Sequence, residues 1–557
     1  MRAVPMAVRR LLRRRVLAGA TLLAGSAALA GCTLMPDEKR PEPLMSPRWA
    51  SGPAYGRGHT PVAATTAFGD ADRIGWREFF RDPQLQALIE YAIRHNLDLR
   101  QAVLNVDAQE ASYRVQRADL IPKLDLSGGG QIQQYPRALS AASASSANLL
   151  GATGTGTGTG SATAVGTANG NSGGSIGSAA STVGSTGSTF RYYQLGLGVT
   201  SYELDLFGRI RSETHQAFEE YLAQVETRRA SQITLVSQVA GDYFTLLADR
   251  RLLDITRQTL AAQQDTLRLT RLMLDRGTNT LLAVRQAETQ VDTAKANLAQ
   301  YQRQVAQDEN ALVLLLGAPM PDVLPPSRGI DGQDLVATLP AELPSIILAR
   351  RPDVLSAEHE LYAANANIGA ARAAFFPQIT LTGGYGTAGT GLKNLFRNDS
   401  RTWTFQPRIT LPIFAAGANV ANLDLAHLQK NIQIAKYQQA IQTAFRETND
   451  SLAGLQTRDD ELADQLQVTA AAADAYRLSR MRFEAGVDTY LTVLDSQRSL
   501  YSAQQSLVNA KQARLANLVT LYKALGGGWF EQSQPPSVLP PQSTTSDGVA
   551  PPAGGRG

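Results

Sequence analysis

Apolar side chains recur every seven residues in a long stretch near the end of the chain. The repeating positions are Leu494, Tyr501, Val508, Leu515 and Tyr522, with a second column at Leu500, Leu507 and Leu521. This period is typical of helices that pack as coiled coils. The residues between the columns are mostly Ala, Gln, Ser, Asn and Lys, which allow close helix contact but no deep core. The pattern therefore predicts a long helix in a coiled-coil bundle.

The same stretch occurs twice, at an offset of 209 positions (486 − 277) and without a gap. The offset aligns Gly486 with Gly277, and each glycine follows a helical run. A glycine there can adopt the left-handed conformation that ends a helix. Asp488 and Asn279, two residues later, are expected to cap the helix that returns. Each copy is thus predicted to form an αα-hairpin with its tip at Gly277 or Gly486.

A second pair of related segments precedes the hairpins. At an offset of 255 (377 − 122), the sequence LIPKLDLSGG at 120–129 aligns with FFPQITLTGG at 375–384. A helix is expected to end before each proline, and a run of alternating apolar and polar residues follows. The predicted strand pairs are 123–135 with 190–204 and 378–387 with 402–413. One face of each strand is apolar and the other polar, as the lipid and lumen faces of a membrane barrel require.

The remaining segments complete the predicted organisation. Residues 140–189 are Gly, Ser, Thr and Ala in near repetition and are expected to form a mobile loop. A helix is predicted over 85–119. Longer helices are predicted over 209–275 and 418–484, each reaching about 100 Å at 1.5 Å per residue. The resulting domains are a signal peptide at 1–31, an extended tether at 32–83, a first repeat at 84–317, a linker at 318–339, a second repeat at 340–526 and a tail at 527–557.

The N-terminus has the pattern of a bacterial lipoprotein signal. A basic region is followed by an apolar stretch, 16–29, that is too short to be a stable membrane anchor and ends in the sequence LAGC. Cys32 is the only cysteine of the chain, and it is the predicted site of lipidation. Thr33 at the next position agrees with delivery to the outer membrane. The alternative is a plain secretory signal with an incidental cysteine. No other segment has about 18 continuous apolar residues, so no spanning helix is predicted.

Charge and composition narrow the possible functions. The net charge of +4 comes from six arginines within residues 1–31, and without them 47 basic residues face 49 acidic ones. Nucleic-acid binding is therefore not expected. The five histidines are scattered without metal-ligand spacing, so neither a metal nor a cofactor other than the lipid is predicted, and the chain is not expected to be an enzyme. The sequence at 173–177 matches G-x-S-x-G, the pattern around the nucleophilic serine of some hydrolases. It lies in low-complexity sequence without a preceding strand, so it does not indicate a catalytic site. The histidines are His59, His95, His215, His359 and His427.

Four strands cannot close a barrel within one chain. The smallest single-chain membrane barrels have eight strands, and open edges in lipid leave backbone groups unsatisfied at several kcal/mol each. Identical chains are therefore expected to pool their strands around a closed symmetry axis. The predicted fold class is mainly α with a membrane β-barrel. Three chains would supply twelve strands, although strand counting alone does not fix the number three.

Several motifs carry a family resemblance. They are the lipobox at Cys32, SYELDLFGR at 201–209, RRPD at 350–353, AR at 371–372 with FP at 376–377, LPIF at 411–414, YLTVLD at 490–495 and KALGGGW at 523–529. Together they resemble the TolC-like outer-membrane efflux channels, in the lipoprotein branch called NodT or OprM-like, over about 70–530. The resemblance implies a homotrimeric, twelve-stranded channel in the outer-membrane lipid, continuous with a long periplasmic α-helical barrel. It would accept substrate from a periplasmic adaptor protein and an inner-membrane efflux pump. Residues 140–189 depart from the family's shorter loops.

The resemblance also implies a gate. In similar channels an acidic residue at the position of Asp495 forms a ring at the periplasmic constriction. Three carboxylates facing one narrow lumen would repel each other and favour cations. Leu491 and Leu494 could add an apolar constriction. The alternative is that Asp495 is a solvated helix carboxylate. Thr492 stands where some relatives have a further acid, so a lock built on that acid is not expected.

Arginines crowd the ends of the helices that lead to the tips. They are Arg268, Arg271, Arg276, Arg477, Arg480 and Arg482. Cations stabilise helix C-termini by a few tenths to about 1 kcal/mol each, which accounts for most of them. Arg480 is expected to lock neighbouring hairpins or to contact the adaptor, because its repeat mate Arg271 is also an arginine. The competing interpretation of the whole chain is a structural or adhesive coiled-coil surface lipoprotein, which would have no amphipathic strand pairs and no pore.

Overall fold

The computed structural model describes residues 33–42, 50, 52–55, 73–134, 189–335 and 350–533. The signal peptide, the lipidation candidate Cys32 and the loop at 140–188 lie outside the described residues. The chain forms two compact units, and each combines segments of both sequence repeats. Unit 1 comprises Met1–Glu38, Glu110–Phe218 and Tyr362–Lys430. Unit 2 comprises Lys39–Gln109, Glu219–Leu361 and Asn431–Gly557.

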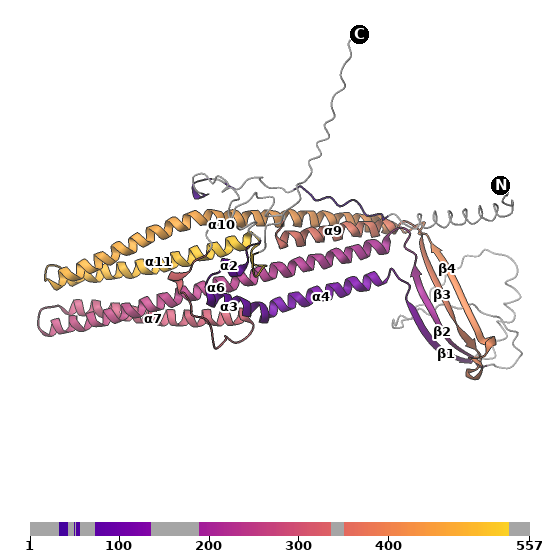
Figure 1. Cartoon of the computed structure of the whole chain (residues 1–557), viewed down its shortest axis with the longest axis horizontal. Coiled ribbons are helices and arrows are strands. Elements are labelled where there is room, and N and C mark those ends of the chain that lie inside the picture. The colour runs from indigo at the N-terminus through magenta and orange to yellow at the C-terminus, as the bar shows by residue number, and fades with distance from the viewer. Residues whose placement is uncertain are drawn as a thin grey trace, which may run out of the picture. The chain divides into compact units, whose positions relative to one another are not determined.

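Unit 1 contains a four-stranded antiparallel sheet in the order β1-β2-β3-β4 (Figure 1). The strands are β1 (Leu124–Gln134), β2 (Thr189–Glu203), β3 (Gln378–Gly389) and β4 (Arg401–Thr410). Each sequence repeat contributes one hairpin, and the pairing of β2 with β3 joins the two. The four predicted strands are confirmed, with ends within a few residues of those expected.

One face of this sheet exposes a row of apolar side chains. Leu126 on β1 lies opposite Leu197 on β2, which lies opposite Tyr385 on β3. Tyr385 in turn lies opposite Trp403 on β4. Directly opposed residues share a face of a sheet. Their exposed fractions run from 49% to 74%, so within the described residues nothing covers this face. The predicted amphipathic character of the strands is confirmed.

Helices lead directly into these strands. The helix α4 (Leu97–Ala118) precedes β1, and α9 (Pro352–Ala373) precedes β3. Phe207, which follows β2, stacks on Phe376 just before β3 with ring centroids 4.7 Å apart. This contact fixes the corresponding corners of the two repeats against each other.

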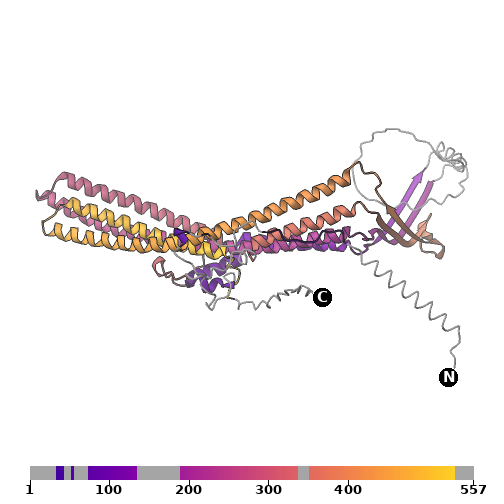
Figure 2. The same cartoon turned by 90° about the horizontal axis from the view of Figure 1, so that it is seen from above.

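Two long helical hairpins carry the repeat seen in the sequence (Figures 1 and 2). The first is α6 (Arg209–Asp275) with α7 (Leu281–Leu316), and the second is α10 (Ala418–Glu484) with α11 (Tyr490–Ala524). Gly277 and Gly486 adopt the left-handed φ values of 68° and 75° at the two turns. The predicted hairpins are thus confirmed. In the described part of the chain, no helix has both the length and the apolar character needed to cross a membrane.

The predicted helix caps at the tips were wrong. The α7 cap is Thr280, whose hydroxyl accepts from the Ala283 N–H. Asn279 instead accepts from the N–H of Thr280. In the second hairpin Thr489 occupies the cap position without a side-chain cap bond. Asp488 pairs with an arginine there, because an ion pair across the turn competes for its carboxylate.

The helix predicted over 85–119 is interrupted. It is divided into α3 (Pro83–His95) and α4 by Asn96, whose backbone is extended. The Asn96 side chain accepts from the Leu99 N–H at 2.7 Å and donates to the Leu315 carbonyl at 2.8 Å. Asn96 therefore caps α4 and binds the end of α7 at once. The break depends on a distant partner that the local pattern did not reveal.

The tether predicted over 32–83 ends earlier than expected. The short helix α2 (Trp76–Phe79) inserts its aromatic side chains into the largest core cluster of unit 2. Phe79 stacks on Tyr522 of α11 with centroids 4.0 Å apart, and the Tyr522 hydroxyl donates to the Ile74 carbonyl at 2.6 Å.

The short 3-10 turns are η1 (Pro53–Tyr55), η3 (Ile330–Gly332), η4 (Leu392–Asn394) and η5 (Asn398–Ser400).

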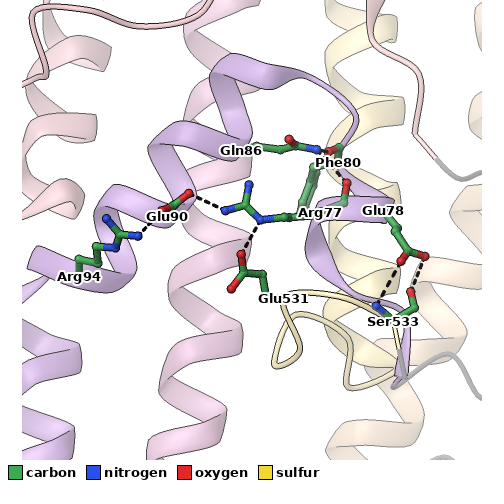
Figure 3. A network of polar contacts seen from close by, with 8 residues as sticks. All are labelled: Arg77, Glu78, Phe80, Gln86, Glu90, Arg94, Glu531 and Ser533. Atoms are coloured by element: carbon green, nitrogen blue, oxygen red, sulfur yellow. Dashed lines mark hydrogen bonds and ion pairs between the residues drawn. The ribbon is translucent and has the colours of Figure 1, made fainter. Parts of the chain in front are cut away.

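The beginning of the predicted tail, 527–533, is also part of unit 2. The Trp76 N–H donates to the Phe530 carbonyl at 2.9 Å. Figure 3 shows Arg77 between Glu531 and Glu90, while Glu90 also binds Arg94. The two ends of the folded chain are thereby joined by backbone and side-chain contacts, which a division by sequence repeat did not reveal.

Candidate functional site

An apolar cluster joins the two hairpins near their tips in unit 2. Buried members come from α6, α7 and α11, and partly buried residues of α6 and α10 pack on them. The cluster comprises Leu267, Val284, Ala287, Val291, Tyr490, Val493 and Leu494, with Leu260, Leu274, Tyr476 and Phe483 packed against it. The tips are therefore held in a fixed arrangement by side chains from all four helices.

The three predicted gate residues of α11 divide into two groups. Leu494 is 6% exposed and packs in the apolar cluster, so its side chain does not line a lumen in this conformation. Leu491 is 59% exposed, and Asp495 is exposed as well. Residues four apart lie on the same face of a helix. Leu491 and Asp495 thus present one exposed apolar and acidic face near the tip.

Arg271 fastens the two arms of the first hairpin. Its guanidinium on α6 binds the Glu288 carboxylate on α7 at 2.7 Å, and Arg285 binds the other oxygen of Glu288 at 2.7 Å. Hydrogen bonds from Arg271 and then Arg285 lower the pKa of Glu288. Sequence reasoning missed Glu288 and Arg285. The available signal was that the arginine before the turn and the glutamate after it carry opposite charges on the two arms of one predicted hairpin.

The second hairpin lacks this connection between its arms. Arg480 pairs at 2.8 Å with Glu484, one turn further along the same helix. The offset of 209 places Gln497 where the first hairpin has Glu288, so no carboxylate is available on α11 at that position. Arg480 also lines a shallow hollow on α10. The residues around it are Tyr476, Arg477, Arg480, Met481 and Glu484.

An ion pair closes the second turn instead. The Arg482 guanidinium binds the Asp488 carboxylate at 2.6 Å, and this bond lowers the pKa of Asp488. Arg482 lies four residues before Gly486, and Asp488 lies two residues after it. The pair therefore fixes the turn itself, while hydrogen bonds from Thr469 of α10 to the Ala503 carbonyl and from Asn517 of α11 to the Ser451 carbonyl join the two helices further from the tip.

Polar side chains alternate with the apolar layers between α11 and the first hairpin. The Tyr501 hydroxyl lies 2.8 Å from the Thr256 hydroxyl of α6. One turn further, the Gln505 amide donates to the Tyr301 hydroxyl of α7 at 2.9 Å. Such bonds specify one register between helices. Any movement of the second hairpin along the first must break them.

A pair of carboxyl groups lies between α6 and α7. Burial, followed by the charge and hydrogen bond of Asp249, raises the pKa of Asp308 to about 7. Asp242 and Glu309 add further negative charge, and Glu309 is paired with Arg250 at 2.8 Å. The described residues contain no group of three or more His, Cys, Asp or Glu placed to hold a metal ion.

Replacing Asp308 with asparagine should stabilise the protein at pH 8 but not at pH 4. The folded pKa of Asp308 lies above its ordinary value of 3.8, so its contribution to stability is present below that value and is lost progressively as the pH rises from 3.8 to about 7. The neutral amide should remove that loss. Melting followed by circular dichroism at both pH values tests this. Asp292→Asn, at an exposed position paired with Lys295, is the control and should leave the pH dependence unchanged. A parent protein with equal stability at the two pH values would contradict the prediction.

Comparison with known proteins gives a consistent result. The family model described as "Outer membrane efflux protein" matches residues 88–318 and 343–527. The toluene efflux pump outer membrane protein TtgC of Pseudomonas putida is 44% identical over 505 residues, which cover 91% of this chain and 94% of that protein. The antibiotic efflux pump outer membrane protein ArpC of the same species gives the same values. The open state of the MtrE outer membrane channel of Neisseria gonorrhoeae has a TM-score of 0.76 and 34% identity, covering 90% of this chain and 100% of that chain.

Proposed function

The chain belongs to the outer membrane efflux protein family, and on this premise we propose that it works as a homotrimer that receives substrate from a periplasmic adaptor and an inner-membrane pump. It is the outer-membrane channel component of an efflux pump and extends into the periplasm. It is a channel and not an enzyme. The predicted family and the mainly helical fold with four antiparallel strands are confirmed.

The observation that carries the trimer is the open four-stranded sheet. The outer strands β1 and β4 each pair on one side only in the described chain, and the apolar row from Leu126 to Trp403 is exposed. In a single chain, both the unpaired strand edges and the exposed apolar face are energetically unfavourable. Three copies would pair β4 of one chain with β1 of the next and close twelve strands.

Two further elements of the proposal concern the substrate and the anchor. The relatives at 44% identity are named for toluene and for antibiotic efflux. We assign this channel the export of small toxic compounds of these kinds, as a passive conduit. The lipoprotein signal pattern supports a covalent lipid at Cys32 that anchors the chain to the outer membrane.

We assign the gate to the tips at Gly277 and Gly486. The exposed face formed by Leu491 and Asp495 supports a constriction there, without Leu494. The adaptor would meet the same tips. Arg271 would hold the arms of the first hairpin together near its tip through its bond to α7, while Arg480 pairs within α10 and makes no equivalent bond to α11. Opening would then displace α10 and α11 along the first hairpin.

Oligomer mass and conductance test this function together. Purified protein in detergent should have the mass of three chains by native mass spectrometry, and planar bilayers containing it should show discrete cation-selective channels. A water-soluble monomer without channel activity would reject the proposed assembly.

Replacing Asp495 with alanine should raise the single-channel conductance and reduce the preference for cations several-fold. Three carboxylates near one narrow lumen attract cations, and removing them also widens the passage. If Arg480 bonds to a neighbouring hairpin in the trimer, the same recordings on Arg480→Ala should show easier opening. Asp292→Ala removes an exposed carboxylate of α7 outside the gate and serves as the control. Unchanged conductance and selectivity in both variants would remove Asp495 and Arg480 from the gate.

A further inference from the structure

The end of the sheet that lies away from the helices carries exposed cations. Helix α9 leads into β3 and β4 leads back to α10, so residues 390–400, which connect β3 to β4, lie at the opposite end of the sheet (Figure 1). Lys393 and Arg397 belong to this connection, Arg401 begins β4, and Arg191 lies near the start of β2. All four side chains are exposed. Positive charge is therefore gathered at one end of unit 1.

Few carboxylates accompany these cations in the sequence. Residues 126–202 contain no Asp or Glu, and residues 378–410 contain only Asp399. These two stretches include nearly all of the four strands and both connections at this end. The Asp399 Oδ1 atom lies 3.9 Å from Arg397 Nε, which is too far for a hydrogen bond. The local charge is therefore strongly positive.

The strand register places two of the arginines on the apolar face. Alternate residues of a strand share one face of the sheet. Arg401 precedes Trp403 by two residues and Arg191 precedes Leu197 by six, so both belong to the face with the row from Leu126 to Trp403. A cation on a lipid-facing strand is costly at the bilayer midplane and costs little near the interface. Arg191 and Arg401 therefore mark the level where the apolar band ends.

The connection between β3 and β4 holds the other two cations in a closed turn. Leu395 is 5% exposed, whereas Leu392 and Phe396 are 64% and 77% exposed. Backbone bonds close the turn, among them the bond from the Arg397 N–H to the Asn394 carbonyl at 3.2 Å. The connection thus exposes apolar and basic side chains together, with one leucine as its buried anchor.

This order of side chains matches the layers of a phosphorylated lipid. An exposed apolar face suits the acyl chains, and aromatic rings such as those of Trp403 and Phe396 suit the interface. Cations beyond the rings meet anionic headgroups. A planar guanidinium can donate two parallel bonds to phosphate oxygens. A merely solvated end of the sheet would not need the exposed apolar side chains, and a purely apolar contact would not need the cations.

We propose that Arg191, Lys393, Arg397 and Arg401, called the basic rim, bind the phosphate groups of lipids in the outer leaflet of the outer membrane. This inference rests on the proposed function, in which the sheet closes within that membrane and the helices lie on the periplasmic side. The connection between β3 and β4 then faces the outside. The basic rim fixes the depth of the sheet in the membrane and gathers phosphorylated lipids around the channel.

Native mass spectrometry of the full-length protein purified in detergent tests this binding. The probe is bisphosphorylated lipid A, added in known amounts. The parent protein should retain it, and the rim variant (Arg191→Gln, Lys393→Gln, Arg397→Gln and Arg401→Gln together) should retain it at least about tenfold more weakly. Lipid A without its phosphates should bind the parent no better than the rim variant binds the intact lipid. Equal retention of the two lipids by the parent would reject phosphate as the ligand.

A matched control lies on the same strand as Arg401. Arg408 is an exposed arginine on the opposite face of β4, so Arg408→Gln removes the same charge outside the basic rim. Retention should stay within about twofold of the parent, because a charge at that distance is largely screened. A loss as large as that of the rim variant would show that general charge holds the lipid. Displacement of lipid A by equimolar inorganic phosphate would show a site for the free anion and reject lipid docking.

The mass of the assembly and its conductance, measured on the same samples, separate this inference from the proposed function. A trimer that conducts but retains no lipid A overturns the basic rim alone. A monomer without conductance whose lipid A retention depends on the basic rim overturns the assembly alone. A monomer that retains no lipid A overturns both.

Discussion

Replacing Asp82 with alanine should lower the free energy of unfolding of unit 2 by about 3–5 kcal/mol. The carboxylate is 2% exposed and accepts from the Tyr243 hydroxyl at 2.9 Å and from the Gln333 amide at 2.6 Å. It also caps α3 by accepting from the Gln84 N–H and accepts from the Arg328 N–H. Alanine would remove the acceptor that these donors share, and the groups come from three separate parts of the chain.

Urea titration of the detergent-solubilised protein, followed by circular dichroism, measures this effect. Asp334→Ala is the control, because its carboxylate is exposed and pairs only with the exposed Arg81. Exposed ion pairs contribute about 0–1 kcal/mol. Similar midpoints for Asp82→Ala and Asp334→Ala would show that the buried carboxylate does not join these segments.

Replacing Arg351 with methionine should cost about 2–4 kcal/mol. The buried guanidinium binds Asp353 at 2.8 and 3.0 Å, Glu447 of α10 at 2.9 Å and the Ala524 carbonyl at 2.9 Å. Burial opposes its charge, but the bonds to Asp353 and then Glu447 outweigh this and raise its pKa. Arg351 thus ties the start of α9 to α10 and to the end of α11, where helix carbonyls lack partners.

The matched control for this substitution is Arg458→Met on α10. Arg458 pairs with Glu461 three residues further along the same exposed helix face, so its loss should change stability by no more than about 0.5 kcal/mol. The same urea titration compares the two variants. If Arg351→Met unfolds at the same urea concentration as Arg458→Met, the buried guanidinium is not the link between the three helices.

The two repeats join the arms of their hairpins through different side chains. The two copies share their turn glycines and their arginines at 271 and 480. They differ where the first copy has Glu288 and the second has Gln497. The first hairpin is therefore joined near its tip by Arg271 and Glu288, whereas the arms of the second are joined further from the tip by Arg514 with Asp459 and by Asn517 with the Ser451 carbonyl.

Much of the fold was predictable because its signals are local. The heptad columns, the glycines at 277 and 486 and the alternation along the strands each depend on residues close together in the sequence. The long helices α6 and α10 accordingly have the bounds that were predicted. The family and the channel function followed from the same motifs.

Features that depend on a contact between residues far apart in the sequence were missed or assigned to the wrong place. Asn96 breaks a helix because its amide finds the Leu315 carbonyl, more than 200 residues away. The aromatics of α2 were assigned to a tether although they pack against Tyr522. Leu494 was expected at the constriction, but the packing of the two hairpins buries it.

The sequence by itself determined the helices, strands and turns of this protein, because periodicity and turn chemistry act over a few residues. It also determined the family, through short motifs. Only the tertiary structure decided which side chains are buried and which arginines join two helices. Those properties depend on groups that folding brings together from both ends of the chain, and the distance between such groups is not written in any local pattern.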